Sequence, residues 1–209
     1  MVLKAQPCHR STIRPMIVEK TLGLLAGSLI AIAQLIYLMN TLKRKVTPSV
    51  LSWLGWALLM GTSLVSQVLG IGWQWSLSSL LLSTIGATTI ALTALFTRNF
   101  SLVKADWKFL VLGLGCIGIY FGSKNPWSTT IFAVVADLIL GIPTITKAYK
   151  DPVSERSFAW ILGVAAQTIA LILCIGHDPL YLLFPLYLFL FNGAMAFLTR
   201  RRAMKQTSS

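Results

Sequence analysis

A carboxylate in the middle of an apolar stretch is the most reactive feature of this sequence. Asp137 is the only acidic side chain placed near the centre of a predicted membrane span. A carboxylate at that depth costs about 2.5–3.5 kcal/mol on insertion scales, so it should face protein or water and not lipid. On a helix it shares a polar or small stripe with Thr130, Gly141 and Thr144. We therefore predict that Asp137 binds a substrate, with the alternative that it only holds helices together.

Three further side chains could complete such a site. The amides of Asn192 and Gln167 can donate and accept hydrogen bonds to a polyol or an amide, although intramembrane amides also commonly link helices. Trp160 and Trp53 could form stacking walls for a ring, but Trp near a helix end more often marks the membrane interface. The interface role is also expected for Trp73, Trp75, Trp107 and Trp127.

Two features near Asp137 suggest movement. Pro143 removes a backbone hydrogen bond to the carbonyl of Ile139 and kinks the helix, as a hinge or as a static feature. The charges that alternate along residues 147–156 could form an intracellular latch, or could simply be solvated.

The composition predicts a membrane protein. The chain has 209 residues, of which 56% are hydrophobic, with a mean hydropathy of +0.74. Six Asp and Glu are too few to solvate a soluble surface of this size, and the 18 Lys and Arg mostly flank apolar stretches. A lipid bilayer is the expected partner, nucleic acid is not, and a soluble enzyme is excluded.

Apolar stretches predict seven spans, each close to the roughly 20 residues that cross a bilayer. We place them at 21–40, 49–70, 75–97, 107–122, 127–147, 157–176 and 179–199. The fourth is short and rich in glycine, so a surface or re-entrant segment is the alternative for it. The first is longer than a signal-peptide core and is expected to be retained.

Lys and Arg residues predict the orientation of these spans. The N-terminal tail and the loops after spans 2, 4 and 6 carry Lys4, Arg10, Arg14, Lys20 and Lys124, and all the others lie on the opposite side. The N-terminus should therefore face outside and the C-terminus the cytoplasm of a cell membrane.

The sequence also contains an internal repeat. Residues 34–53 and 144–160 share one pattern. Each segment begins late in a predicted helix, passes through a basic loop that contains a proline, and ends at a tryptophan. The prolines are Pro48 and Pro152, and the tryptophans are Trp53 and Trp160. Spans 1–3 therefore match spans 5–7, and span 4 links them. An odd linker span gives both units the same orientation, a parallel repeat about an axis along the membrane normal.

These segments resemble the PQ-loop superfamily, which includes the SWEET and SemiSWEET sugar facilitators. The resemblance rests on Gly141 to Thr144 followed by a charged loop and Trp160, and on a weaker copy at Ala33 and Gln34. It implies an all-α membrane protein with two parallel three-helix bundles joined by a linker helix (3+1+3). It also implies hinges at Pro143, Thr144, Ala33 and Gln34, and a pocket role for Asn192.

The predicted organisation is an outside tail (1–20), a first repeat (21–98), a linker with span 4 (99–126), a second repeat (127–200) and a cytoplasmic tail (201–209).

The first hypothesis is a transporter or facilitator of a small polar solute, sugar-like or cationic, working by alternating access. The alternative is a non-transporting scaffold or receptor. No catalytic residue, metal site or cofactor is expected, because the spans lack a His, Glu and Asp cluster and a Ser–His pair. The sequence leaves homo-oligomer formation open.

Overall fold

The computed structural model describes residues 16–101 and 125–206 continuously, with a few isolated positions between them. Its helices are α1 (Met16–Leu42), α2 (Val50–Ile71), α3 (Leu77–Phe96), α5 (Pro126–Lys150), α6 (Ala159–Cys174) and α7 (Leu180–Gln206), and a short 3-10 helix, η1 (Pro152–Glu155), joins α5 to α6. The all-helical class is thus confirmed.

Five of these helices, α1, α2, α3, α5 and α7, are long and apolar enough to cross a membrane, which is compatible with a multi-pass membrane protein. Helix α6 has 16 residues, or about 24 Å at 1.5 Å per residue. It ends before the predicted limit at 176, because the chain turns at Gly176 with φ of 89°. Helices α1 and α7 extend beyond their predicted spans, since hydropathy marks the membrane-facing part of a helix and not its ends.

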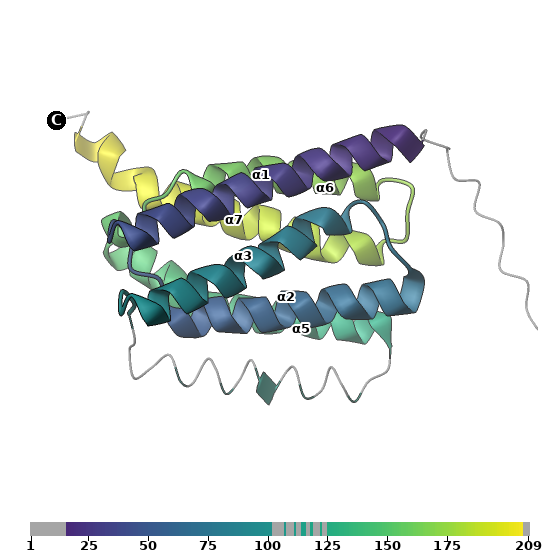
Figure 1. Ribbon diagram of the computed structural model, residues 1–209, viewed down its shortest axis with the longest axis horizontal. Coiled ribbons are helices and arrows are strands. Elements are labelled where there is room, and N and C mark those ends of the chain that lie inside the picture. The colour runs from purple at the N-terminus through teal and green to yellow at the C-terminus, as the bar shows by residue number, and fades with distance from the viewer. Residues whose placement is uncertain are drawn as a thin grey trace, which may run out of the picture.

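The prediction of span 4 at 107–122 falls almost entirely outside the described residues. Helix α3 ends at one end of the bundle and α5 begins at the other (Figure 1). The seven-span arrangement stays a prediction.

The six helices pack as two groups with the same internal order. In the first group α3 contacts both α1 and α2, and in the second group α7 contacts both α5 and α6. The groups meet through α1 against α6 and α2 against α5, with a smaller contact of α3 with α6. The largest buried aromatic side chains therefore gather where the two groups face each other.

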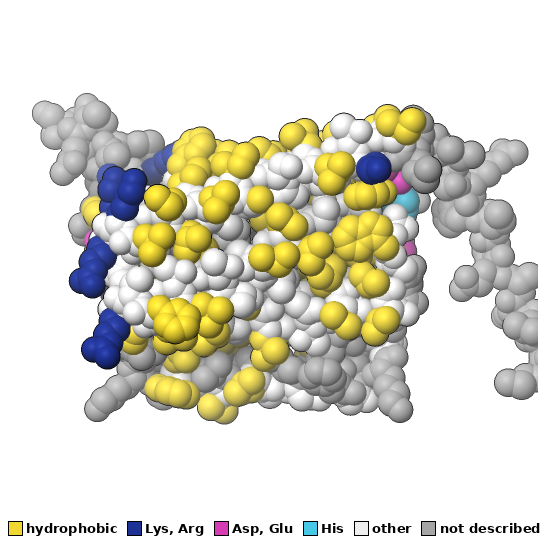
Figure 2. Space-filling model, viewed as in Figure 1, with side chains coloured by type: hydrophobic (Ala, Val, Ile, Leu, Met, Phe, Trp, Pro, Cys, Tyr) yellow, Lys and Arg dark blue, Asp and Glu magenta, His cyan; other side chains and the backbone are white. Residues whose placement is uncertain are grey.

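Charge divides the two ends of the bundle. At the end where α1, α3, α5 and α7 terminate and α2 and α6 begin, the described cations are Lys43, Arg44, Lys45, Arg98, Lys147, Lys150, Arg156 and Arg200. We call this the basic end. At the opposite end the described residues include one Lys, Lys20, together with Glu19, His177 and Asp178. Figure 2 shows most of the blue side chains at the basic end, a blue side chain beside magenta and cyan ones at the opposite end, and apolar side chains spread over the surface between the ends.

Candidate functional site

A cavity lies between the two groups and brings the predicted binding residues together. Asp137, Asn192, Trp160 and Gln167 all line it. Its volume is about 70 Å³, counted as space for the centres of water-sized spheres. The complete lining is Ile30, Ala33, Gln34, Tyr37, Trp53, Trp56, Met60, Ser83, Asp137, Ala159, Trp160, Gly163, Gln167, Leu188, Phe191 and Asn192. The cavity thus takes residues from all six described α-helices of the two groups.

Of the four predicted hinge residues, two line the cavity and two lie outside its lining. Ala33 and Gln34 line the cavity from α1, whereas Pro143 and Thr144 lie in α5 outside its lining. Helix α5 continues through Pro143 to Lys150 without interruption. Thr144 is fully buried, and its hydroxyl has no hydrogen-bond partner among the described residues.

Aromatic rings line the cavity on the side of the basic end. Trp53 packs against Tyr37 with ring centroids 4.7 Å apart, and against Trp56 at 5.2 Å. Phe191 lies 5.3 Å from Trp56 and 6.3 Å from Trp160. These contacts join rings from four helices of both groups into one layer.

The interface prediction is wrong for Trp53 and Trp160. Both are buried, at 4% and 6% exposed. Position near a helix end could not reveal this, because the neighbouring helices cover both rings. Trp73, Trp107 and Trp127, in contrast, are exposed as the interface role requires.

Several buried polar atoms in the cavity walls have no hydrogen-bond partner in the described structure. They are Oδ1 of Asp137, both amide atoms of Gln167 and Nε1 of Trp53. The hydroxyl of Tyr187 lies beside the Asp137 carboxylate, close enough to interact electrostatically, yet it makes no hydrogen bond that meets geometric criteria. Buried polar groups in native proteins are nearly always paired, so unpaired ones call for an explanation.

Asn192 is positioned by its own helix and by a glycine. Its Nδ2 donates a hydrogen bond to the carbonyl of Leu188 at 2.6 Å. A Cβ at Gly163 of α6 would overlap the Asn192 side chain, so only glycine permits this approach. Gly86 of α3 accommodates the side chain of Gln34 in the same way.

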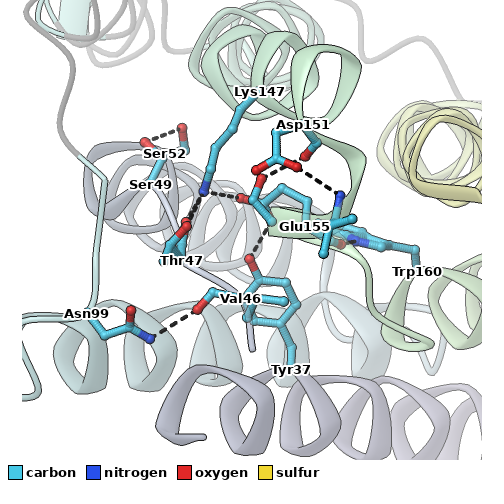
Figure 3. A network of polar contacts seen from close by, with 12 residues as sticks. Tyr37, Val46, Thr47, Ser49, Ser52, Asn99, Lys147, Asp151, Glu155 and Trp160 are labelled. Atoms are coloured by element: carbon cyan, nitrogen blue, oxygen red, sulfur yellow. Dashed lines mark hydrogen bonds and ion pairs between the residues drawn. The ribbon is translucent and has the colours of Figure 1, made fainter. Parts of the chain in front are cut away.

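Below the aromatic layer, at the basic end, a polar network joins the two groups (Figure 3). Tyr37 of α1 donates a hydrogen bond to Oε2 of Glu155 at 2.6 Å, and Lys147 of α5 pairs with Oε1 at 3.0 Å. Lys147 also donates to the hydroxyl of Thr47 at 2.8 Å and to its backbone carbonyl. We call Tyr37, Thr47, Lys147 and Glu155 the Glu155 cluster.

The backbone supports this cluster from both sides. The amide of Thr47 donates to the carbonyl of Ser154 at 3.3 Å, which joins the α1–α2 loop to η1. The indole of Trp160 donates to the backbone carbonyl of Glu155 at 2.9 Å, so the cluster and the aromatic layer are directly connected. The alternating charges of 147–156 are therefore not simply solvated, because Glu155 is fully buried.

Burial raises the pKa of the Glu155 carboxyl above the usual value for glutamate, since the charged form loses water. Lys147 and the hydroxyl of Tyr37 act in the other direction but do not outweigh burial.

A second, smaller cavity lies nearer the opposite end. Its volume is about 10 Å³ on the same measure, enough for roughly one water molecule. It shares Gln167 and Leu188 with the central cavity, and Gln67 also lines it. At this end His177 lies 3.3 Å from Glu19, in a polar contact between the groups.

Sequence reasoning missed Tyr37, Trp56 and Phe191, and it included Glu155 only as one of the alternating charges of 147–156. One signal for two cluster members was present: Tyr37 and Lys147 occupy equivalent positions in the repeat that aligns Gln34 with Thr144. For metals, no group of three or more His, Cys, Asp or Glu suited to an ion lies within the part of the chain that the structure describes.

In comparisons with known proteins, no family model, no curated protein and no solved structure matches the chain.

Proposed function

We propose that this chain is a multi-pass membrane transporter or facilitator of a small polar solute, alternating access between its first and second groups. The observation that carries the proposal is the central cavity, which both groups line and which contains buried polar atoms without partners. Transporters built from repeats hold their substrate near the bilayer midplane, at the interface between the repeats. A protein that only held helices together would gain nothing from leaving these groups unpaired.

The proposed architecture is the 3+1+3 arrangement of two parallel three-helix bundles, resembling the PQ-loop superfamily. It is supported by the shared packing order, because the third helix lies between the other two in each group. The reciprocal contacts of α1 with α6 and α2 with α5 fit a two-fold relation between repeats. The basic end would face the cytoplasm, in agreement with the distribution of Lys and Arg.

In this proposal the described conformation is closed to the cytoplasm. The aromatic layer and the Glu155 cluster lie between the cavity and the basic end, so a solute could leave on that side only if the groups separate there. Pro143 in α5 and the pair of Ala33 and Gln34 in α1 are the proposed hinges, since both helices carry residues of the cavity and of the cluster.

A reversible cross-link between the groups tests alternating access. Thr47 and Ser154 are joined by a backbone hydrogen bond, so Thr47→Cys with Ser154→Cys places two thiols on neighbouring backbone segments of the two groups. The native Cys8, Cys116 and Cys174 are first replaced by Ser. Counterflow of a panel of labelled sugars and small cationic solutes is then measured in proteoliposomes, before and after oxidation.

The matched control cross-links a neighbouring pair that does not involve the second group. Ser49→Cys with Ser101→Cys joins the start of α2 to the segment just after α3, and these two positions already form a β-bridge. Oxidation should stop counterflow in the first pair, reduction should restore it, and the control pair should keep it throughout. Undiminished flux with a complete Thr47–Ser154 cross-link would rule out opening at the basic end. Absence of flux for every solute in the uncross-linked protein would favour the scaffold or receptor.

A further inference from the structure

The charge of the central cavity is not balanced by its walls. Asp137 is 2% exposed and is the acidic residue of the lining, and no Lys, Arg or His is among the lining residues described. Its neighbour Tyr187 is a neutral hydroxyl. A carboxylate in a low-dielectric site favours a proton or a cation as its partner, so the cavity selects for positive charge.

Aromatic rings surround the same position. The indole Nε1 of Trp56 donates to the backbone carbonyl of Asp137 at 3.1 Å, which fixes this ring beside the carboxylate's own helix turn. Phe191 and Trp160 extend the aromatic wall, with ring centroids 6.3 Å apart. The faces of such rings attract ammonium groups, and aromatic cages are the usual protein site for quaternary ammonium.

The cavity has room for a small solute, with a volume of about 70 Å³ for the centres of water-sized spheres.

One side chain in the cavity is suited to a hydroxyl group. Gln167 is 1% exposed, and neither its Oε1 nor its Nε2 has a hydrogen-bond partner in the described structure. A hydroxyl both donates and accepts, so a single amide can satisfy it in both directions.

From this combination we propose that the cavity binds a small organic ammonium cation that carries a hydroxyl group, with Asp137 as counter-ion, the aromatic layer as cage and Gln167 as hydroxyl partner. The proposal rests on the transport function proposed above, because it names the substrate class of the same cavity.

The test compares choline with its neutral isostere 3,3-dimethylbutan-1-ol, in which carbon replaces the charged nitrogen. Purified protein in detergent is titrated with each compound, and both the thermal unfolding midpoint and the displacement of radiolabelled choline are measured. Choline should raise the midpoint by a few degrees at saturation, as a ligand of the folded state does. The isostere should leave it unchanged and should not displace choline.

Variants assign the effect to the cavity. Asp137→Asn should weaken choline binding by at least about tenfold, the equivalent of one charged contact. Asp178→Asn neutralises a carboxylate in the turn before α7 and should bind choline as wild type does. If Asp137→Asn does not fold, Phe191→Leu keeps an apolar wall but removes a ring, and should weaken choline binding several-fold without affecting the isostere.

Equal binding of choline and the isostere, or unchanged choline binding by Asp137→Asn, would overturn the cation proposal. A rise of the unfolding midpoint at acidic pH, with no effect of choline on it, would also overturn the proposal, because the proton would then be the partner of Asp137. Failure of the transport function has a different signature, namely choline binding without choline counterflow. Counterflow of a sugar without choline binding would retain transport and reject the cation.

Discussion

Glu155 and Asp137 are both buried carboxylates, at 0% and 2% exposed, but their surroundings differ. Glu155 accepts hydrogen bonds from Tyr37 and Lys147 on separate oxygens, and its backbone carbonyl accepts one from Trp160. Asp137 has an oxygen without any hydrogen bond, and only a tyrosine hydroxyl beside it. Both belong to the second group and face the first across the same interface.

The difference separates two uses of buried charge. A carboxylate whose partners come from the protein fixes one arrangement of the chain, and removing it leaves those partners unpaired. A carboxylate without a charged protein partner is costly inside a membrane helix, and such a residue suggests a functional site. On this basis we propose that Glu155 holds the two groups together and that Asp137 binds a ligand.

Removing the side chain of Glu155 should have the largest effect on stability. Glu155→Ala removes the acidic partner of Lys147, which keeps its hydrogen bonds to Thr47, and leaves the Tyr37 hydroxyl unpaired between the groups. Loss of one partner of a buried pair typically costs 3–5 kcal/mol, and because Lys147 keeps some solvent contact we expect about 3 kcal/mol. The unfolding midpoint in detergent, followed by tryptophan fluorescence, measures it. Glu155→Gln, which can still accept from Tyr37, serves as the control and should lose less.

Tyr37→Phe should have an intermediate effect, because it removes one hydrogen bond and keeps the ring packed against Trp53. A hydrogen bond to a charged group contributes about 1.5–3 kcal/mol, so we expect a loss of about 2 kcal/mol. Hydrogen exchange of the backbone amides near Thr47 should become faster, since the link between the groups weakens there. Unchanged exchange with an unchanged midpoint would mean that the Glu155 cluster does not hold the groups together.

Asp137→Asn should change the unfolding free energy of the empty protein by less than about 1 kcal/mol, or should raise it, because the carboxylate has no charged partner to lose. The contrast with Glu155→Ala is the sharpest test of the comparison. The same denaturation assay, run without solute, measures both variants. A loss as large as that of Glu155→Ala would show that Asp137 has a structural role.

The smallest expected effect is a dependence of stability on pH. The pKa of Glu155 is raised by burial in the folded state, with Tyr37, Lys147 and Asp151 as the other groups that act on it. The folded protein therefore binds this proton more tightly than the unfolded chain does. The associated stability is full below the usual glutamate pKa and is lost as the pH rises through the raised pKa. The midpoint should fall slightly over that range in wild type, and this component should be absent in Glu155→Gln.

Much of the fold could be predicted from the sequence because it depends on local properties. Helix positions follow from apolar stretches, and each of the six described helices overlaps one predicted span, although α1 begins earlier and α7 ends later than predicted. The candidate site also followed in part: Asp137, Asn192, Gln167 and Trp160 are each unusual for their position in a span, and all four line one cavity. The functional roles of these residues stay predictions.

What the sequence by itself determined is therefore the helical class, the apolar surface and the segregation of charge, which depend on composition and on neighbours along one helix. Only the tertiary structure decided which polar residues are paired. Tyr37 and Glu155 are separated by 118 positions, and Trp56 contacts Asp137 across 81. Helical periodicity places a residue on a face but does not specify which face of another helix lies opposite. The burial of Trp53 and Trp160, and the difference between Glu155 and Asp137, arise from that packing.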